Sequence, residues 1–87
     1  MYLHLGQDTV VSDGDILGIF DLDTSTVSKV TRDYLTAADK EGRVVNVSFE
    51  LPKSFVVCAD KKDGKAKVYI SPISSSTLKK RMKNLSF

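Results

Sequence analysis

The stretch that decides the fold runs from position 54 to position 70 and reads SFVVCADKKDGKAKVYI. Residues 54–59 are apolar on both faces of an extended chain, which is typical of a strand that is covered on each side. Residues 60–65 are polar and contain a glycine, so they suit a turn, and residues 66–70 then place an apolar side chain at every second position. This pattern predicts a β-hairpin with a basic turn.

Outward from this hairpin, four other segments have the pattern of strands. Residues 2–5 and 9–11 flank a Gly-Gln-Asp turn and predict a short hairpin. Residues 16–22 are apolar on both faces, which predicts either a central strand or a strand that faces a subunit partner, and Gly18 lets a ring or a backbone come close to it. Residues 44–51 alternate regularly, which predicts a strand with one solvated face.

A main helix is predicted over about residues 25–39. One of the residues 23–25 can cap its start, Gly42 suits its end, and Lys29 can pair with Asp33 one turn later on the exposed side. The apolar positions keep helical spacing and form the stripe that we expect to dock on the sheet: Val27, Val30, Tyr34, Leu35 and Ala38.

A second, short helix is predicted near the C-terminus. Residues 74–77 all carry hydroxyls that can cap a helix, and residues 77–83 then supply two helical turns. Leu78, Met82 and Leu85 form one apolar stripe, which can dock on the sheet or on a neighbouring subunit. Free amides at the helix start, with hydroxyls and nearby lysines, suit a phosphate or another anion, but an ordinary capped helix explains the same residues. Both interpretations stay open at this point.

Together these elements predict an α+β fold, a small and mostly antiparallel β-sheet domain with one main helix and a short C-terminal helix. We expect residues 1–87 to form a single domain whose last six residues are mobile. A chain this short buries a smaller share of its surface than a larger domain does, so we also expect self-association.

The composition argues against several classes of protein. The apolar share of 41% and the charged share of 28% are those of an ordinary soluble globule, and no apolar run approaches the roughly 20 residues that a membrane-spanning helix needs. The N-terminus lacks the features of a secretory signal, so we expect a cytoplasmic protein with no membrane partner. Cys58, the single cysteine, is expected to pack in the core, and His4, the single histidine, is expected to be a half-buried strand residue.

The sequence carries no recognisable catalytic motif. It has no glycine-rich phosphate loop, no dinucleotide fingerprint, and no cysteines or histidines at metal-ligand spacing. The acid pairs Asp13/Asp15 and Asp21/Asp23 lie where turns and caps use aspartate, with no nucleophile or base beside them. We therefore expect no enzyme activity, no metal or other cofactor and no small-molecule substrate.

The charge is divided unequally along the chain. Residues 1–52 contain four Lys or Arg against nine Asp or Glu, a net charge of −5, whereas residues 53–87 contain nine against two, a net charge of +7. Such a division is compatible with a basic face that binds nucleic acid. It is equally compatible with head-to-tail association between the acidic and basic faces of identical subunits.

Four segments together resemble the B branch of the Rem family, the extracellular matrix regulatory proteins of Gram-positive bacteria. They are YLHLG at 2–6, DILGIFD at 15–21, PKS at 52–54 and SPISSSTLKKR at 71–81. The similarity extends over nearly the whole chain except the last six residues, and the combination is more specific than any one segment. The resemblance implies a single Rem-type regulatory domain in the cytoplasm, without enzyme activity.

The resemblance also implies something about DNA. The sister A branch consists of DNA-binding transcriptional activators of biofilm-matrix genes that form ring-shaped homo-oligomers, and its DNA-contacting arginines lie in the turns before the second long strand and the penultimate strand. In this sequence those turns are residues 12–15 and 50–53. The charged residues of the first turn are all acidic, and the only cation of the second turn is Lys53. No arginine role therefore carries over to this chain.

Any contact with DNA then has to come from other cations. Lys65, Lys67 and Tyr69 are expected to share the outward face of one strand, although an ordinary solvated face has the same pattern. Lysines attract phosphate but read bases poorly, so we expect weak, salt-sensitive and mostly non-specific binding. The candidate DNA-binding residues are Lys53, Lys61, Lys62, Lys65, Lys67, Lys79, Lys80 and Arg81.

Two functions from different classes remain. The first is a DNA-binding transcription regulator of extracellular matrix and biofilm genes that acts as a homo-oligomer, whose ring would multiply weak contacts through effective concentration. The alternative is an oligomeric adaptor whose basic tail contacts an acidic protein partner, or the acidic half of its own neighbour, without touching DNA.

Overall fold

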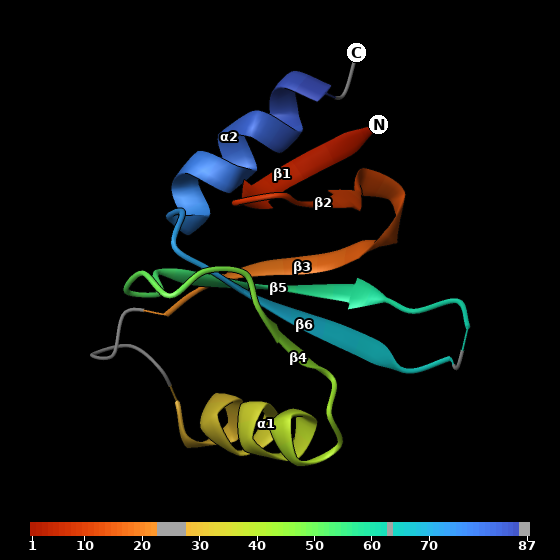
Figure 1. The fold of residues 1–87 in the computed structure, drawn as a ribbon, viewed down its shortest axis with the longest axis vertical. Helices are drawn as coiled ribbons and strands as arrows, with labels where there is room; N and C mark the ends of the chain where they lie inside the picture. The colour runs from red at the N-terminus through yellow and green to blue at the C-terminus, as the bar shows by residue number, and fades with distance from the viewer. Residues whose placement is uncertain (23–27, 63, 86–87) are drawn as a thin grey trace.

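The computed structural model describes residues 1–22, 28–62 and 64–85, with the backbone alone for 84 and 85. Along the chain the elements are β1 (Tyr2–Gly6), β2 (Thr9–Ser12), the 3₁₀ turn η1 (Asp13–Asp15), β3 (Ile16–Asp21), α1 (Lys29–Lys40), β4 (Val44–Asn46), β5 (Ser54–Ala59), β6 (Ala66–Ser71) and α2 (Ser75–Leu85). Figure 1 shows them in layers, with α1 on one face of a sheet and both α2 and the β1–β2 hairpin on the other.

The sheet has four strands in the order β3-β5-β6-β4. The central strand β5 runs antiparallel to both β3 and β6, while β4 runs parallel to β6 at the far edge. Strands β1 and β2 pair antiparallel as a separate two-stranded sheet. The predicted α+β fold with a mostly antiparallel sheet is therefore confirmed, as is the predicted hairpin of β5 and β6.

Strand β5 is apolar on both faces because a separate cluster of buried side chains lies against each face. Val56 and Cys58 pack with Leu3, Leu5 and other residues in the larger cluster, beneath the β1–β2 hairpin and α2. In contrast, Phe55 packs with Ala38 of α1 and Val68 of β6 in the smaller cluster. Cys58 is buried, as predicted.

The β1–β2 hairpin is attached to the main sheet by both apolar and polar contacts. Leu3 and Leu5 are buried, and the buried hydroxyl of Ser71 donates a 2.6 Å hydrogen bond to the backbone oxygen of Leu5. His4 is exposed rather than half-buried, because it points to the other side of the strand, where its Nε2 lies 2.6 Å from the carbonyl oxygen of Gln7.

Helix α1 begins later than predicted, at Lys29. Ser28 is the N-cap, because its backbone is extended and its hydroxyl accepts the backbone N–H of Thr31 at 3.2 Å. The predicted caps at 23–25 lie outside the described residues. At the other end, Gly42 takes a positive φ of 72° just after the last turn, which confirms the predicted stop.

The predicted apolar stripe of α1 is only partly docked. Leu35 and Ala38 pack in the smaller cluster, but Val30 is 79% exposed and Tyr34 is also exposed, so the prediction is wrong for these two residues. Docking at the C-terminal half of the helix is enough to hold it on the sheet, and the N-terminal half stands open. Val27, the remaining member of the stripe, lies outside the described residues. Lys29 Nζ lies 3.8 Å from Asp33 Oδ2, as predicted.

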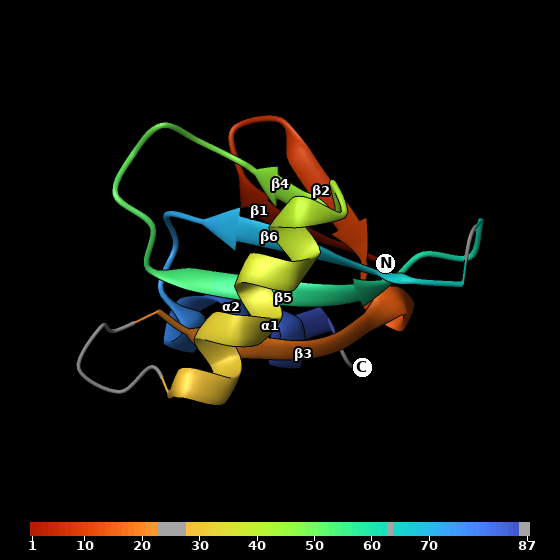
Figure 2. The ribbon, with the colours of Figure 1, turned by 90° about the horizontal axis from the view of Figure 1, so that it is seen from below.

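Two strands differ from their prediction. β3 is an edge strand rather than a central one, and its Leu17 and Phe20 side chains are exposed. β4 ends at Asn46, so Phe49 and Leu51 lie in a loop instead of a long strand. Figure 2 shows this loop leaving the sheet beside β4 before the chain returns into β5.

β4 ends early because its partner ends. Asn46 is paired with Ile70, and the N–H of Val47 still donates to the oxygen of Ile70 at 3.0 Å. β6 then stops at Ser71, and Pro72 turns the chain towards α2. Residues 48–51 therefore have no strand to pair with, whatever their alternation.

Two side-chain predictions for the sheet have opposite outcomes. Tyr69 does not face outward, because the β1–β2 layer covers that face of β6 and the ring packs against the larger cluster. Gly18 does allow a close ring, since a Cβ atom built on it would lie 2.6 Å from the ring of Phe20.

Helix α2 is longer than predicted, from Ser75 to Leu85. It includes Met82, which packs against the larger cluster, so four of the last six residues, 82–85, are helical, while 86 and 87 lie outside the described residues. None of the helices in the described ranges is long and apolar enough to cross a membrane.

Candidate nucleic-acid interface

Helix α2 turns one side to the core and another to solvent. Leu78 is fully buried and Met82 packs beside it, one turn further on. Helical spacing then directs Lys79, Lys80 and Lys83 to the opposite side, where all three are exposed. We call these three residues the lysine face. They line a shallow hollow of about 330 Å³ together with Ser76 and Thr77.

The lysine face is not neutralised by nearby acid. No Asp or Glu follows position 63 in the sequence, although six Lys or Arg do. Within the described residues, no carboxylate forms an ion pair with any lysine of this face. Its positive charge is therefore available to an external anion.

The start of α2 has an ordinary cap. The hydroxyl of Ser74 accepts the backbone N–H of Thr77 at 3.3 Å and lies 2.9 Å from the Thr77 hydroxyl and 3.2 Å from that of Ser76. The hydroxyls of this turn thus satisfy one another and a backbone amide, as the capped-helix interpretation expects. The side chains of the lysine face, rather than the helix start, are what this element offers to an anion.

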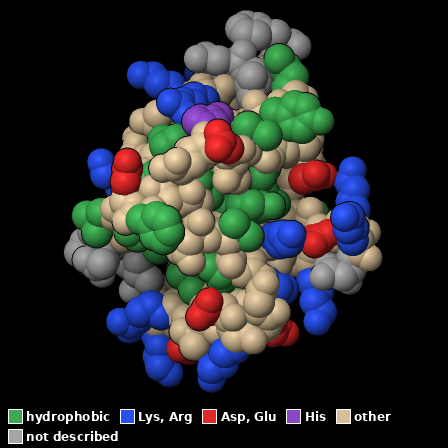
Figure 3. All heavy atoms as spheres, viewed as in Figure 1, with side chains coloured by type: hydrophobic (Ala, Val, Ile, Leu, Met, Phe, Trp, Pro, Cys, Tyr) green, Lys and Arg blue, Asp and Glu red, His purple; other side chains and the backbone are tan. Residues whose placement is uncertain are grey.

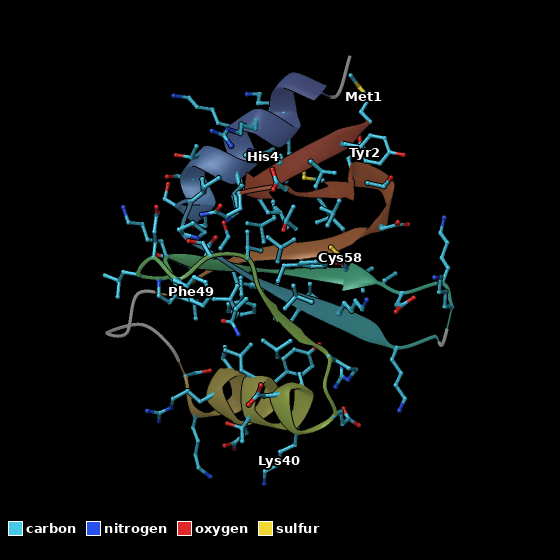
Figure 4. All side chains as sticks on the ribbon, viewed as in Figure 1. Met1, Tyr2, His4, Lys40, Phe49 and Cys58 are labelled. Carbon is cyan, nitrogen blue, oxygen red and sulfur yellow. The ribbon has the colours of Figure 1, made fainter. Side chains whose placement is uncertain are left out.

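Arg81 does not belong to the lysine face. Its Nη1 donates a 3.4 Å hydrogen bond to the backbone oxygen of His4, which bridges α2 and β1. Figure 4 shows His4 on β1 directly beneath α2. Arg81 therefore helps to position the helix, a role that no pattern in the sequence indicates.

A second group of cations surrounds the turn between β5 and β6. Lys61, Lys62 and Lys67 line a hollow of about 420 Å³ together with Tyr2 and Tyr69 and other residues of the hairpin. The turn is closed by backbone hydrogen bonds between Asp60 and Lys65 and between Gly64 and Asp60, both of 3.0 Å. These are the tip lysines that the sequence predicted.

The tip lysines are less available than the lysine face. Lys61 Nζ lies 3.4 Å from Asp15 Oδ1, and Asp15 belongs to the same hollow. Within the structure's coverage Lys62 and Lys67 have no such partner. The net positive charge here is thus smaller than the sequence suggests.

The two groups of cations do not form one surface on a single subunit. The β5–β6 turn extends from one end of the sheet, whereas α2 begins at its other end (Figure 1). Lys53 lies at the α2 end, because its N–H donates to the oxygen of Ser71 at 2.9 Å. Figure 3 accordingly shows Lys and Arg side chains in separate places around this face, with apolar and neutral surface between them.

Two further charged residues play structural roles that the sequence did not indicate. Arg43 donates from Nη1 to the backbone oxygen of Ala66 at 2.7 Å and from Nε to Glu41 at 2.8 Å. These bonds join the end of α1 to the start of β6. The hydrogen bond from Arg43, with its charge, lowers the pKa of the Glu41 carboxyl.

The geometry offers no site for metal chemistry among the residues that the structure covers, where no three His, Cys, Asp or Glu side chains gather. Cys58 is not a reactive thiol, because burial and the nearby Asp15 raise its pKa to about 11. What the described surface presents instead is exposed lysine on a fixed helix.

Comparison with known proteins identifies the family of this chain. The model of the RemA-like family, described as extracellular matrix regulatory protein A-like, matches residues 2–82. Extracellular matrix regulatory protein B of Bacillus subtilis (strain 168) is 43% identical over 81 residues, which cover 93% of this chain and 89% of that protein. Both matches agree with the resemblance carried by the four sequence segments. The chain therefore belongs to the RemA-like family of extracellular matrix regulatory proteins.

Proposed function

We propose that the protein is a non-enzymatic regulator of extracellular matrix genes that binds DNA as a homo-oligomer. The observation that carries the proposal is the lysine face of α2, three exposed cations on a docked helix that form no ion pair with a carboxylate of the described residues. The regulatory part is supported by the family and by the name of the Bacillus subtilis relative.

The chemistry of the lysine face determines the kind of binding. Ammonium groups attract phosphates as point charges, with little ability to distinguish base edges. Binding of this kind depends on counterion release and so weakens steeply as salt rises. A single subunit with three such groups would bind weakly, and several subunits held together would bind much more tightly through effective concentration.

The acidic turn at residues 12–15 does not oppose this proposal. The N-terminal ammonium of Met1 lies 3.2 Å from Asp13 Oδ1, and Lys61 lies 3.4 Å from Asp15. Both acids therefore already have a cation beside them. Repulsion between this turn and a phosphate backbone is weakened accordingly.

The test is binding of a fluorescent DNA duplex, measured by anisotropy over a range of salt concentrations. The Lys79→Ala/Lys80→Ala variant should bind at least about tenfold more weakly at moderate salt. Its plot of log affinity against log salt should be shallower by about 1.8 for each subunit that contacts the duplex, since about 0.9 is lost per phosphate contact. Alanine is a strong helix former, so α2 should remain folded.

The matched control is Arg32→Ala/Lys40→Ala, which removes two exposed cations from α1 on the other side of the sheet. It should leave both the affinity and the salt dependence unchanged. A folded wild-type oligomer that binds no duplex at low salt would overturn the DNA part of the proposal and favour the adaptor. Equal losses in both variants would show that the contact is not made by α2.

A further inference from the structure

An apolar groove lies between the N-terminal half of α1 and the edge strand β3. Its volume is about 380 Å³, and its lining is almost entirely apolar and aromatic: Leu17, Phe20, Val30, Thr31, Tyr34, Phe55 and Val57. Leu17 is 67% exposed and Val30 is 79% exposed, so a domain with a small core leaves large side chains in water here. The rings of Phe20 and Phe55 stack 5.0 Å apart and give the groove a firm floor.

A second apolar surface lies on the loop of residues 47–53, which we call the apolar loop. Phe49 is 110% exposed and Leu51 is 80% exposed, which makes Phe49 the most exposed of the large apolar side chains in the described part of the chain. Figure 4 shows Phe49 on this loop at the side of the molecule.

The apolar loop is held in place rather than collapsed. The N–H of Val47 donates to Ile70 at 3.0 Å and that of Lys53 donates to Ser71 at 2.9 Å, so both ends are fixed to β6. Inside the loop, the N–H of Glu50 donates to the hydroxyl of Ser48 at 2.9 Å. With the backbone held in this way, the side chains of Phe49 and Leu51 remain exposed.

Among the described residues, the lining of the groove includes none from the apolar loop of its own subunit. The loop follows β4 and the groove borders β3, which are the two opposite edges of the sheet. Figure 2 shows the loop leaving beside β4, which is the edge of the sheet opposite to β3. Any contact between them has to join two molecules.

We propose that the apolar loop of one subunit inserts Phe49 and Leu51 into the apolar groove of a second copy of the same chain. One such contact, repeated from subunit to subunit, covers both exposed apolar surfaces at once, whereas a different partner would cover one and leave the other in water. This inference rests on the self-association in the proposed function and names the surfaces that make it.

Charge at the two surfaces supports the same pairing. Glu50 is the charged residue between the two inserting side chains, and it is exposed. The groove reaches the first turn of α1, where the helix dipole is positive; the neighbouring Lys29 already has Asp33 3.8 Å away. An acid carried by the loop therefore arrives at the positive end of the groove. Because the two surfaces differ, the contact is head-to-tail and produces a ring if it closes or a filament if it does not.

The test uses two variants with one damaged surface each, and the mass is measured by light scattering during gel filtration without DNA. Phe49→Ser/Leu51→Ser removes the loop contact and keeps the groove, whereas Val30→Glu blocks the groove and keeps the loop. All three side chains are exposed, so both variants should fold, which circular dichroism can verify. We expect the wild type to be an oligomer and each variant alone to be a monomer.

Mixing the two variants gives the decisive result. A head-to-tail contact predicts that an equimolar mixture forms a species of two subunits and nothing larger. The intact loop of Val30→Glu can enter the intact groove of Phe49→Ser/Leu51→Ser, and the resulting pair has no further intact loop or groove. The matched control, Tyr2→Ser/Val10→Ser, removes two exposed apolar side chains from the β1–β2 hairpin and should keep the wild-type mass.

Three results would overturn the inference: a monomeric wild type, a variant that keeps the wild-type mass, or a mixture with no two-subunit species. Because DNA is absent throughout, the outcome is separate from the anisotropy measurement. An intact oligomer that ignores DNA would refute the proposed function while leaving this contact standing.

Discussion

Cys58 shows how burial in the core changes the pKa of a single side chain. Its side chain is 4% exposed, in the larger cluster beneath the β1–β2 hairpin, and burial is the main cause of the rise of its pKa to about 11. A thiolate would have to exist among apolar neighbours with Asp15 nearby, which disfavours the charged form. The native fold therefore holds the proton more tightly than the unfolded chain does.

This difference predicts slow alkylation and an alkaline limit to stability. At pH 8 the native thiol should react with iodoacetamide at least about a hundredfold more slowly than the same cysteine in urea, because so little of it is thiolate. The free energy of unfolding should fall as pH rises above about 9, since the unfolded thiol then loses its proton before the native one. Rapid alkylation of the folded protein, followed by mass spectrometry, would contradict the burial of this residue.

Gly18 is a second residue whose substitution is limited by its surroundings. A methyl group there would lie 2.6 Å from the ring of Phe20, which stacks on Phe55. We expect Gly18→Ala to displace the ring and to lower the free energy of unfolding by about 1 kcal/mol, the low end of the usual cost of overpacking, since the ring is partly exposed. Urea denaturation checks this. Gly14→Ala is the matched control, because its nearest neighbour is 3.9 Å away, and it should change little.

At the scale of elements, small contacts decide which layers stay together. The β1–β2 hairpin covers the main sheet through Leu3 and Leu5, and the hydroxyl of Ser71 joins the two sheets at Leu5. The same hydroxyl accepts the N–H of Ile73 at 3.1 Å, in the turn that leads to α2. One buried side chain therefore connects three elements.

Ser71→Ala should loosen that connection. The substitution leaves the Leu5 oxygen without this donor and the Ile73 N–H without its acceptor, which costs about 1–3 kcal/mol for buried groups. Hydrogen exchange should show faster exchange in β1 and in the first turn of α2. As a control, Ser12→Ala removes a hydroxyl that forms no hydrogen bond with the described residues and should stay within about 0.5 kcal/mol of the wild type. Unchanged exchange in Ser71→Ala would show that apolar packing alone holds the layers.

The sequence predicted well the elements whose structure is determined by residues within the element itself. The β5–β6 hairpin has its turn residues between two apolar runs, and the start of α2 has its hydroxyl caps. In contrast, the alternation of residues 44–51 could not show that β6 stops at Ser71 and leaves the second half without a partner. Likewise, the apolar residues of β3 gave no sign of which edge of the sheet they would occupy.

The candidate site was also predictable only where it depends on residues close together in the sequence. Charge counting found the basic tail, and helical spacing separates the lysine face from Leu78 and Met82. The sequence could not show that Arg81 bonds to His4 or that Asp15 lies beside Lys61, because these pairs are distant along the chain and near one another only in the fold.

At the scale of the whole molecule, the unequal charge of the two parts is modified by pairing. Several acids of the first part have a cation within reach, as Asp13 has the N-terminus, Asp33 has Lys29 and Glu41 has Arg43. Within the part of the chain that the structure describes, the lysine face forms no such ion pair. The surface that remains strongly charged is therefore basic, and it lies on the side of the sheet away from α1 and its groove (Figure 1).

Because the proposed assembly contact and the proposed DNA contact use different surfaces, two variants should separate them. Phe49→Ser/Leu51→Ser should be a monomer. Its lysines are intact, but it lacks the effective concentration that neighbouring subunits supply, so it should bind DNA about a hundredfold more weakly at moderate salt. Lys79→Ala/Lys80→Ala should keep the wild-type mass and still bind weakly, because each subunit then contributes fewer phosphate contacts. Light scattering and anisotropy on the same samples provide the comparison, with Arg32→Ala/Lys40→Ala as the control that should lose neither property. If the monomeric loop variant bound DNA as tightly as the wild type, a single subunit would be sufficient, and assembly would have to serve something other than DNA affinity.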